Sequence, residues 1–241
     1  MKISRLQEII SESHQLVERT FACEFDAPVL RLNSKHIRIP AKPAAQSVYY
    51  GRPINHEYTI TFQRQAEHLE DGADLRYGLL LETSHALIFG VGQRNGSADS
   101  MPKKTEKQSP VWLAFYNGLS EYITFRSAVN SGNYSLVEKA KERDLLLKNG
   151  METVIQGALN DVNQFNKERV RSPYESIDPD DMEGFLLSYL KRNPILLDRY
   201  GSCIGYAYAR NSSREVLQMI LEPPKELYEL IYLWEKPPLQ A

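Results

Sequence analysis

Two apolar runs in the middle of the chain are the strongest pattern in the sequence. Leu79–Leu81 and Ala86–Phe89 show no alternation with polar residues, and the turn-type residues Glu82–His85 separate them. Continuous apolar runs of this length are typical of strands that are buried on both faces, and the short polar separation suits a hairpin connection. Residues 75–96 are therefore predicted to form a hairpin at the centre of a sheet.

The rest of the N-terminal half combines helix, strand and proline-rich patterns. Residues 2–20 place apolar side chains near one face of a helix. Residues 29–32 and 36–39 are short strand candidates, and residues 58–62 alternate as a half-buried strand does. Residues 40–53 contain three prolines, which fix φ and remove backbone donors, so an ordered loop or a sheet edge is predicted there.

Helical patterns follow from residue 111 onward. Asn149-Gly150 and Asn193-Pro194 predict helix ends within them. A cap, a proline and first-turn acids indicate a helix that begins at Asp178. The glycine-interrupted alternation of Tyr200–Tyr208 instead predicts a strand that returns to the sheet. The predicted helices cover 111–129, 135–148, 151–170, 178–192, 213–221 and 224–236.

These patterns predict an α+β fold. Its central, mostly antiparallel sheet comes from the N-terminal half, and helices of the C-terminal half pack across it. Residues 93–110 are rich in Gly, Ser, Lys and Pro and contain few apolar residues, which predicts a mobile loop. We expect the strand-rich portion 1–110 and the helix-rich portion 111–241 to pack as one domain.

Composition and charge narrow the class of protein. The chain has 241 residues, enough for a substantial core, and a formal net charge of −2, which argues against a globally basic nucleic-acid binder. Cys23 and Cys203 form no CxxC pair, which excludes a disulfide-dense scaffold and a zinc ribbon. No apolar run reaches the roughly 18 residues that span a bilayer, and the N-terminus lacks the apolar segment of a signal peptide. A cytoplasmic protein with no membrane partner is the expectation.

A phosphate-binding loop is suggested by Gly90, Gly92 and Gly96, which follow the predicted hairpin. A dinucleotide fingerprint requires G-x-G-x-x-G running directly into a helix, whose N-terminus faces the phosphates. The spacing here is G-x-G-x-x-x-G, and the sequence that follows is polar and interrupted by proline. The glycines therefore predict a strand exit, and no cofactor is expected.

Three residues are candidates for catalysis, each with a plainer interpretation. His56 precedes the alternating strand and His85 lies in the predicted hairpin turn, but neither belongs to an HxxxH, HExxH or paired His-x-Thr pattern. Cys203 is flanked by glycines that could expose it as a nucleophile, although buried free cysteine is commoner as a small hydrophobe. The carboxylates of 175–183 match helix capping better than cation binding, so no metal site is predicted.

Aromatic and basic residues supply the candidate binding surface. They are Tyr49, Tyr50, Arg52, Arg94, Lys103, Lys104 and Lys107. The first three lie in the proline-rich segment, where the two tyrosines are expected to be exposed and to offer contact area with a polar end. The other four lie in the loop 93–110, where their charges can neutralise nucleic-acid phosphates, although the loop holds no aromatic residue for base stacking.

Every catalytic pattern fails on spacing, so the sequence favours a binding or regulatory protein that acts through macromolecular interaction, as an accessory or inhibitory factor. A protein partner is expected, with nucleic acid as a second class of partner through the basic loop. The alternative is an enzyme acting on a nucleotide or nucleic acid, with residues 90–107 as a lid. Convergence of the candidate histidines and arginines on one pocket would favour the enzyme, whereas a flat surface carrying Tyr49 and Tyr50 would favour binding.

Overall fold

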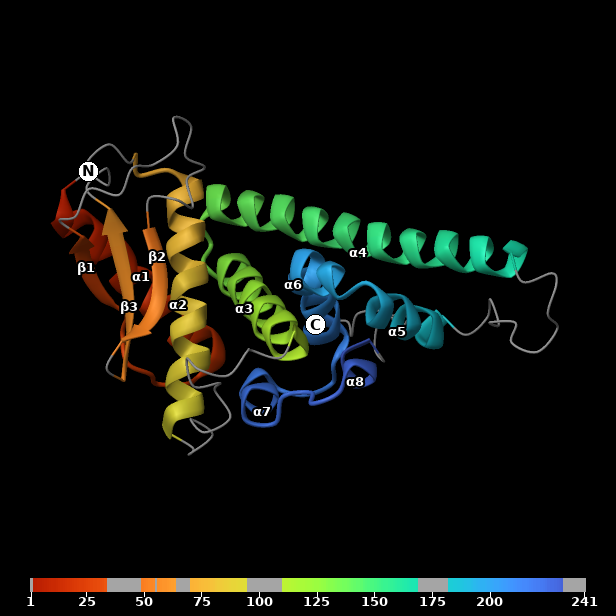
Figure 1. Cartoon of the computed structure of the whole chain (residues 1–241). Coiled ribbons are helices and arrows are strands. Elements are labelled where there is room, and N and C mark those ends of the chain that lie inside the picture. Colours follow the sequence, from red (N-terminus) through yellow and green to blue (C-terminus); the bar gives the residue numbers. More distant parts are fainter. Residues whose placement is uncertain are drawn as a thin grey trace. The chain divides into compact units, whose positions relative to one another are not determined.

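A computed structural model describes residues 2–33, 49–54, 56–63, 70–94, 110–168 and 182–231. Helices dominate this part of the chain, and three strands form one small sheet (Figure 1). The elements are α1 (Ile3–Phe21), β1 (Val29–Asn33), β2 (Tyr49–Ile54), β3 (Glu57–Gln63), α2 (Ala73–Arg94), α3 (Pro110–Asn130), α4 (Tyr134–Glu168), α5 (Met182–Arg192), α6 (Pro194–Asn211), α7 (Val216–Leu221) and α8 (Leu227–Ile231). None of the helices in these ranges is both long enough and apolar enough to cross a membrane.

The chain divides into two compact units. Unit 1 comprises Met1–Met101 and Ser120–Arg143, and unit 2 comprises Pro102–Leu119 and Asp144–Ala241. The divisions fall inside α3 and inside α4, so each of these helices contributes to both units. The predicted packing of the two halves of the chain as one domain stays a prediction.

The sheet has the strand order β1-β3-β2 and mixed direction. β1 runs parallel to β3, with Val29 opposite Thr59, and β2 runs antiparallel to β3, with Tyr49 opposite Phe62. The strands predicted at 29–32 and 58–62 are confirmed. The prediction of a central, mostly antiparallel sheet is wrong, because the sheet is small and one of its two strand pairings is parallel.

The predicted hairpin at 75–96 is also wrong, because Ala73–Arg94 form the continuous helix α2. This helix is buried around most of its circumference, so no exposed polar face interrupts its apolar runs. Short apolar runs alone do not distinguish a buried strand from a buried helix. The supposed turn is helical, since Thr83 Oγ1 and Ser84 Oγ each donate to the carbonyl one turn earlier, at 2.8 and 3.0 Å.

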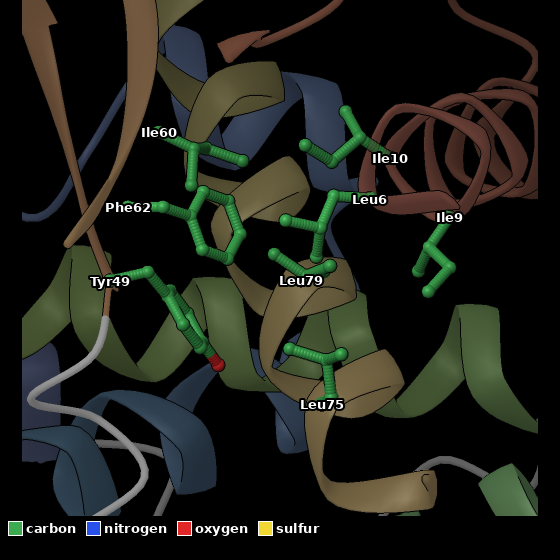
Figure 2. Packing of buried hydrophobic residues seen from close by; sticks show 8 residues of the cluster. All are labelled: Leu6, Ile9, Ile10, Tyr49, Ile60, Phe62, Leu75 and Leu79. Atoms are coloured by element: carbon green, nitrogen blue, oxygen red, sulfur yellow. The ribbon is translucent and has the colours of Figure 1, made fainter. Parts of the chain in front are cut away.

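Helices α1 and α2 bury one face of the sheet. Figure 2 shows the side chains that meet there from the two helices and the strands. They are Leu6, Ile9, Ile10, Tyr49, Ile60, Phe62, Leu75 and Leu79. Burying each large apolar side chain stabilises the fold by about 1.5–3 kcal/mol. The helices in this core belong to the N-terminal half, which corrects the prediction that C-terminal helices pack across the sheet.

In unit 2, two segments that were predicted to be a helix end and a strand are both helical in the structure. The predicted end at Asn149-Gly150 is wrong, because α4 continues through it. Gly150 leaves room for Cys203 of α6, whose Sγ would lie 2.5 Å from a Cβ at residue 150. The predicted strand at Tyr200–Tyr208 is wrong as well, because it lies within α6. Its glycines permit close helix packing, since a Cβ at Gly205 would overlap the backbone of α3.

Other predicted boundaries agree with the structure or lie outside the described residues. The helical pattern of 111–129 is confirmed by α3, and α6 begins with Pro194 directly after α5 ends. The strand predicted at 36–39 and the helix start at Asp178 lie outside the described residues. Of the predicted loop 93–110, both ends are helical and residues 95–109 lie outside the described part.

Candidate functional site

Strand β2 places the two candidate tyrosines on opposite faces of the sheet. Tyr49 points into the core with 8% of its surface exposed, so its predicted exposure is wrong. Side chains alternate along a strand, so Tyr50 and Arg52 lie on the opposite face, beside Thr61 and Thr59 of β3. We call this surface the outer sheet face. It consists of Arg31, Tyr50, Arg52, Thr59 and Thr61.

Two cationic side chains flank the middle of the outer sheet face. Arg31 on β1 and Arg52 on β2 are both exposed, and neither has an ion-pair partner within the described ranges. Thr59 and Thr61 between them are buried, at 0% and 7% exposed. Tyr50 is half-buried, and the guanidinium carbon of Arg52 lies 5.6 Å from its ring centroid, which is cation–π geometry. The exposed groups of this face are therefore the two arginines and part of Tyr50, with the threonines buried between them.

A polar cluster lies behind the sheet, where β3, α2 and α3 meet. Tyr58 Oη donates to Glu82 Oε2 at 2.7 Å, and His85 Nε2 lies 2.9 Å from Ser120 Oγ. His85 Nδ1 is 3.8 Å from Glu82 Oε2. Burial, with the charge of Glu82 and the hydrogen bond to it, raises the pKa of Tyr58 above its usual value. Tyr58 therefore stays a neutral donor to the carboxylate.

The order Ser120–His85–Glu82 is that of a nucleophile, a base and a carboxylate, but the geometry does not support this chemistry. Ser120 is 0% exposed in the interior of α3, so a substrate cannot reach its hydroxyl. Backbone amides in a helix interior already bond within the helix and cannot form an oxyanion hole. The cluster instead pairs buried polar groups of neighbouring elements, as does the bond between Ser84 and Thr124 at 2.9 Å. His85 Nδ1 is the exception, since it is buried without a hydrogen-bond partner among the described residues.

A buried carboxylate lies one residue beyond Ser120. Glu121 is 4% exposed and accepts hydrogen bonds from Tyr77 Oη at 3.3 Å and from Arg143 Nε at 3.0 Å. The Nη2 atom of Arg143 also bonds to this carboxylate. A buried charge is tolerable only when it is paired and hydrogen-bonded in this way. Glu121 therefore links α2, α3 and α4 within unit 1.

The remaining candidate side chains of unit 1 have separate neighbours. His56 is exposed in the turn between β2 and β3, with φ of 67°. Arg94 at the end of α2 donates to the carbonyl of Glu24 at 3.0 Å and pairs with Asp26 at 3.4 Å. No described hydrogen bond or ion pair joins any two of Arg52, His56, His85 and Arg94. The convergence that would favour an enzyme is therefore not observed among these residues.

Cys203 and the lysines complete the predicted set. Cys203 is a free thiol, 8% exposed, and packs in unit 2 against Gly150, as a small hydrophobic side chain does. Lys103, Lys104 and Lys107 lie outside the described residues. Within the described ranges, no group of three His, Cys, Asp or Glu side chains is arranged to hold a metal ion.

Several residues of these sites were not singled out by the sequence. Glu82 and Ser120 become visible only once Ala73–Arg94 is recognised as a helix, because Glu82 and His85 then share a face at i,i+3 spacing. Arg31 could have been found from strand alternation, since it faces away from Leu30 and Leu32 of the same strand. Comparison of the chain with protein-family models, with curated proteins and with solved structures finds no match in any of the three.

Proposed function

We propose that the protein acts by binding an acidic, extended segment of a partner protein on the outer sheet face. The observation that carries this proposal is the pair of exposed arginines, Arg31 and Arg52, on the two strands that flank β3. Neither has an ion-pair partner among the described residues. Complementary charge steers partners together and fixes their register, and arginine and tyrosine are enriched in protein interfaces.

The strand geometry sets the spacing of the acidic groups in the partner. Arg31 lies beside Thr61 and Arg52 lies beside Thr59, two residues apart along β3. With strands about 4.8 Å apart and a rise of about 3.3 Å per residue, the Cα atoms of the two arginines are roughly 12 Å apart. Side chains at positions i and i+4 of an extended peptide share one face and lie about 13 Å apart, so carboxylates at this spacing match the two guanidinium groups. The packed core behind the sheet holds this platform in place.

A nucleic acid is less well matched to this face than a protein. Recognition of single strands relies on open aromatic faces on which bases stack. The one aromatic residue of the outer sheet face, Tyr50, is half-buried and has Arg52 over its ring. An enzyme acting on a nucleotide is also less well supported, since the candidate catalytic residues have separate neighbours and Ser120 is buried.

Fluorescence anisotropy with a designed peptide tests the proposal. The probe is a labelled peptide with a threonine- and valine-rich extended sequence and glutamates at i and i+4, and its partner probe replaces both glutamates with glutamine. We expect saturable binding of the glutamate peptide only. Binding should weaken at least about tenfold in Arg31→Gln/Arg52→Gln, because each lost charge-assisted bond is worth roughly 1.5–3 kcal/mol.

A matched control is Lys2→Gln/Lys141→Gln, which removes two exposed charges elsewhere on unit 1 and should leave binding unchanged. Equal loss of binding in this control would indicate only a net-charge effect and would contradict the proposed face. Absence of binding to the glutamate peptide would also contradict the proposal. Binding of labelled polyuridine that depends on Arg31 and Arg52 would assign the face to nucleic acid instead.

A further inference from the structure

A small pocket in unit 1 lies apart from the outer sheet face, between α1, α2 and the turn that joins α3 to α4. Its volume is about 180 Å³. Ile9, Leu16, Leu80 and Leu136 form its apolar lining. An apolar cavity of about 150 Å³ is sufficient for one benzene molecule. The pocket therefore has room for a single small molecule or one apolar side chain.

Arg76 and Glu12, two of the charged residues that line the pocket, already have charged partners. Arg76 donates to both carboxylate oxygens of Asp71, at 2.7 and 2.9 Å, and to Glu12 at 2.9 Å. The pKa of Asp71 is held below its usual range, mainly by the hydrogen bond from Arg76. Arg76 and Glu12 therefore line the pocket with fixed partners and do not supply the charge that a ligand would meet.

Three other polar side chains of the lining keep unused hydrogen-bonding groups. Ser13 is 7% exposed, yet its hydroxyl has no hydrogen-bond partner within the described structure. The Nε atom of Arg19 donates to the carbonyl of Gln15 at 3.2 Å, whereas its two terminal nitrogens have no described partner. The side-chain oxygen of Asn133 caps the start of α4. Its amide nitrogen has no described hydrogen-bond partner.

All three unused groups can donate a hydrogen bond, and one of them is cationic. The Ser13 hydroxyl lines the pocket without a described hydrogen-bond partner, so it can donate to a ligand oxygen that takes the place of solvent. A guanidinium with two free nitrogens matches the two oxygens of a carboxylate. The lining thus presents an apolar pocket with donors for one anionic, two-oxygen group.

We propose that this pocket binds the carboxylate of a small apolar acid, with the hydrocarbon body against the four aliphatic residues and the carboxylate on Arg19 and Ser13. The volume limits the body to roughly six carbons, the size of a benzene ring. This chemistry is present in a free branched or aromatic acid and in the C-terminal residue of a peptide that ends in leucine. Both sources share the same contacts, and the experiment separates them.

Isothermal titration calorimetry of the full chain tests the proposal with three named probes: 4-methylpentanoate, the neutral 4-methylpentan-1-ol, and N-acetyl-leucine as the peptide C-terminus. We expect saturable binding of at least one of the two acids and much weaker binding of the alcohol. Stronger binding of N-acetyl-leucine would assign the pocket to a peptide end, and stronger binding of 4-methylpentanoate to a free acid.

Variants of the lining residues test whether the acid binds in this pocket. Arg19→Gln should weaken binding of the acid about tenfold, whereas Arg52→Gln on the outer sheet face should leave it unchanged. Ser13→Leu should abolish binding by filling the pocket, and thermal unfolding shows whether this variant folds. Absence of binding of both acids at millimolar concentration, or equal affinity in wild type and Arg19→Gln, would overturn the proposal. Neither outcome bears on peptide binding to the outer sheet face.

Discussion

The phenol oxygen of Tyr49 in β2 lies directly against Gly78 of α2, where the Cβ of any other residue would overlap it. Tyr49 is buried, so it has little freedom to move aside. We expect Gly78→Ala to destabilise the protein by about 1–3 kcal/mol, the usual cost of overpacking a core, as measured by urea unfolding. The matched control is Gly72→Ala, since a Cβ at residue 72 would meet nothing within 4 Å.

The same contact has a second test in a double variant. Tyr49→Phe removes the hydroxyl that the new methyl group would overlap, so Tyr49→Phe/Gly78→Ala should regain part of the stability lost in Gly78→Ala. A double-mutant cycle isolates this coupling because the two residues touch. Strictly additive effects of the two substitutions would show that the hydroxyl is not the obstacle.

The buried phenol of Tyr49 makes the stability of the protein depend on pH in the alkaline range. Burial, followed by the charges of Glu82 and Asp74, raises the pKa of Tyr49 from 10.0 to about 12. Because the folded-state pKa lies above the unfolded one, this contribution is fully present below pH 10 and is lost as the pH rises through 12. When the pH rises from 9 to 11.5, the free energy of unfolding of wild type should fall by on the order of 2 kcal/mol more than that of Tyr49→Phe, because phenylalanine has no phenol to ionise. Equal losses in urea unfolding at the two pH values would contradict the prediction.

Close packing of α3 against α6 gives a prediction for unit 2. A Cβ at Gly205 would overlap the backbone carbonyl of Ala114, and a Cβ at Gly118 would overlap the backbone of Gly205. Backbone cannot move aside without separating the helices, so Gly205→Ala and Gly118→Ala should each lower the thermal midpoint clearly. Gly157→Ala is the matched control, because its obstacle is the end of the Tyr189 side chain, 2.5 Å away. An equal shift for Gly157→Ala would contradict this explanation.

The Glu121–Arg143 pair predicts an asymmetric response to substitution. Arg143→Met leaves the carboxylate of Glu121 buried without its main partner, so we expect a loss of about 3 kcal/mol or more in urea unfolding. Replacing both residues, as Glu121→Leu/Arg143→Met, should recover much of that loss because no charge remains buried. The control Lys141→Met breaks the exposed ion pair with Glu138 and should change stability little. A small effect of Arg143→Met would mean that water reaches Glu121.

Patterns with a clear polar face were predictable from the sequence. Residues 58–62 alternate strictly, and both the strand and its buried face follow from that alternation. α2 was not predictable in this way, because a helix buried around most of its circumference has no polar stripe that would reveal its period. Likewise the glycines of Tyr200–Tyr208 suggested strand irregularity, but their function is close approach between helices, which depends on the partner helix.

The candidate sites were predictable only in part, for a related reason. Tyr50 and Arg52 stood out by residue type, and the strand register then placed them on one face with Arg31. The pocket brings Ser13 and Arg19 of α1 together with Asn133, which lies more than 100 residues later in the chain. No local pattern marks this site, because tertiary packing alone brings Asn133 to α1.

The interleaving of the two units has a consequence for the order in which the protein can fold during synthesis. Unit 1 needs residues 120–143, but these leave the ribosome only after residues 102–119, which belong to unit 2. Until then, Tyr77 of the nascent α2 lacks its partner Glu121, and Ser84 lacks its partner Thr124. A newly made N-terminal segment thus displays unpaired polar groups beside apolar surface, the condition in which chaperones engage nascent chains and in which aggregation begins.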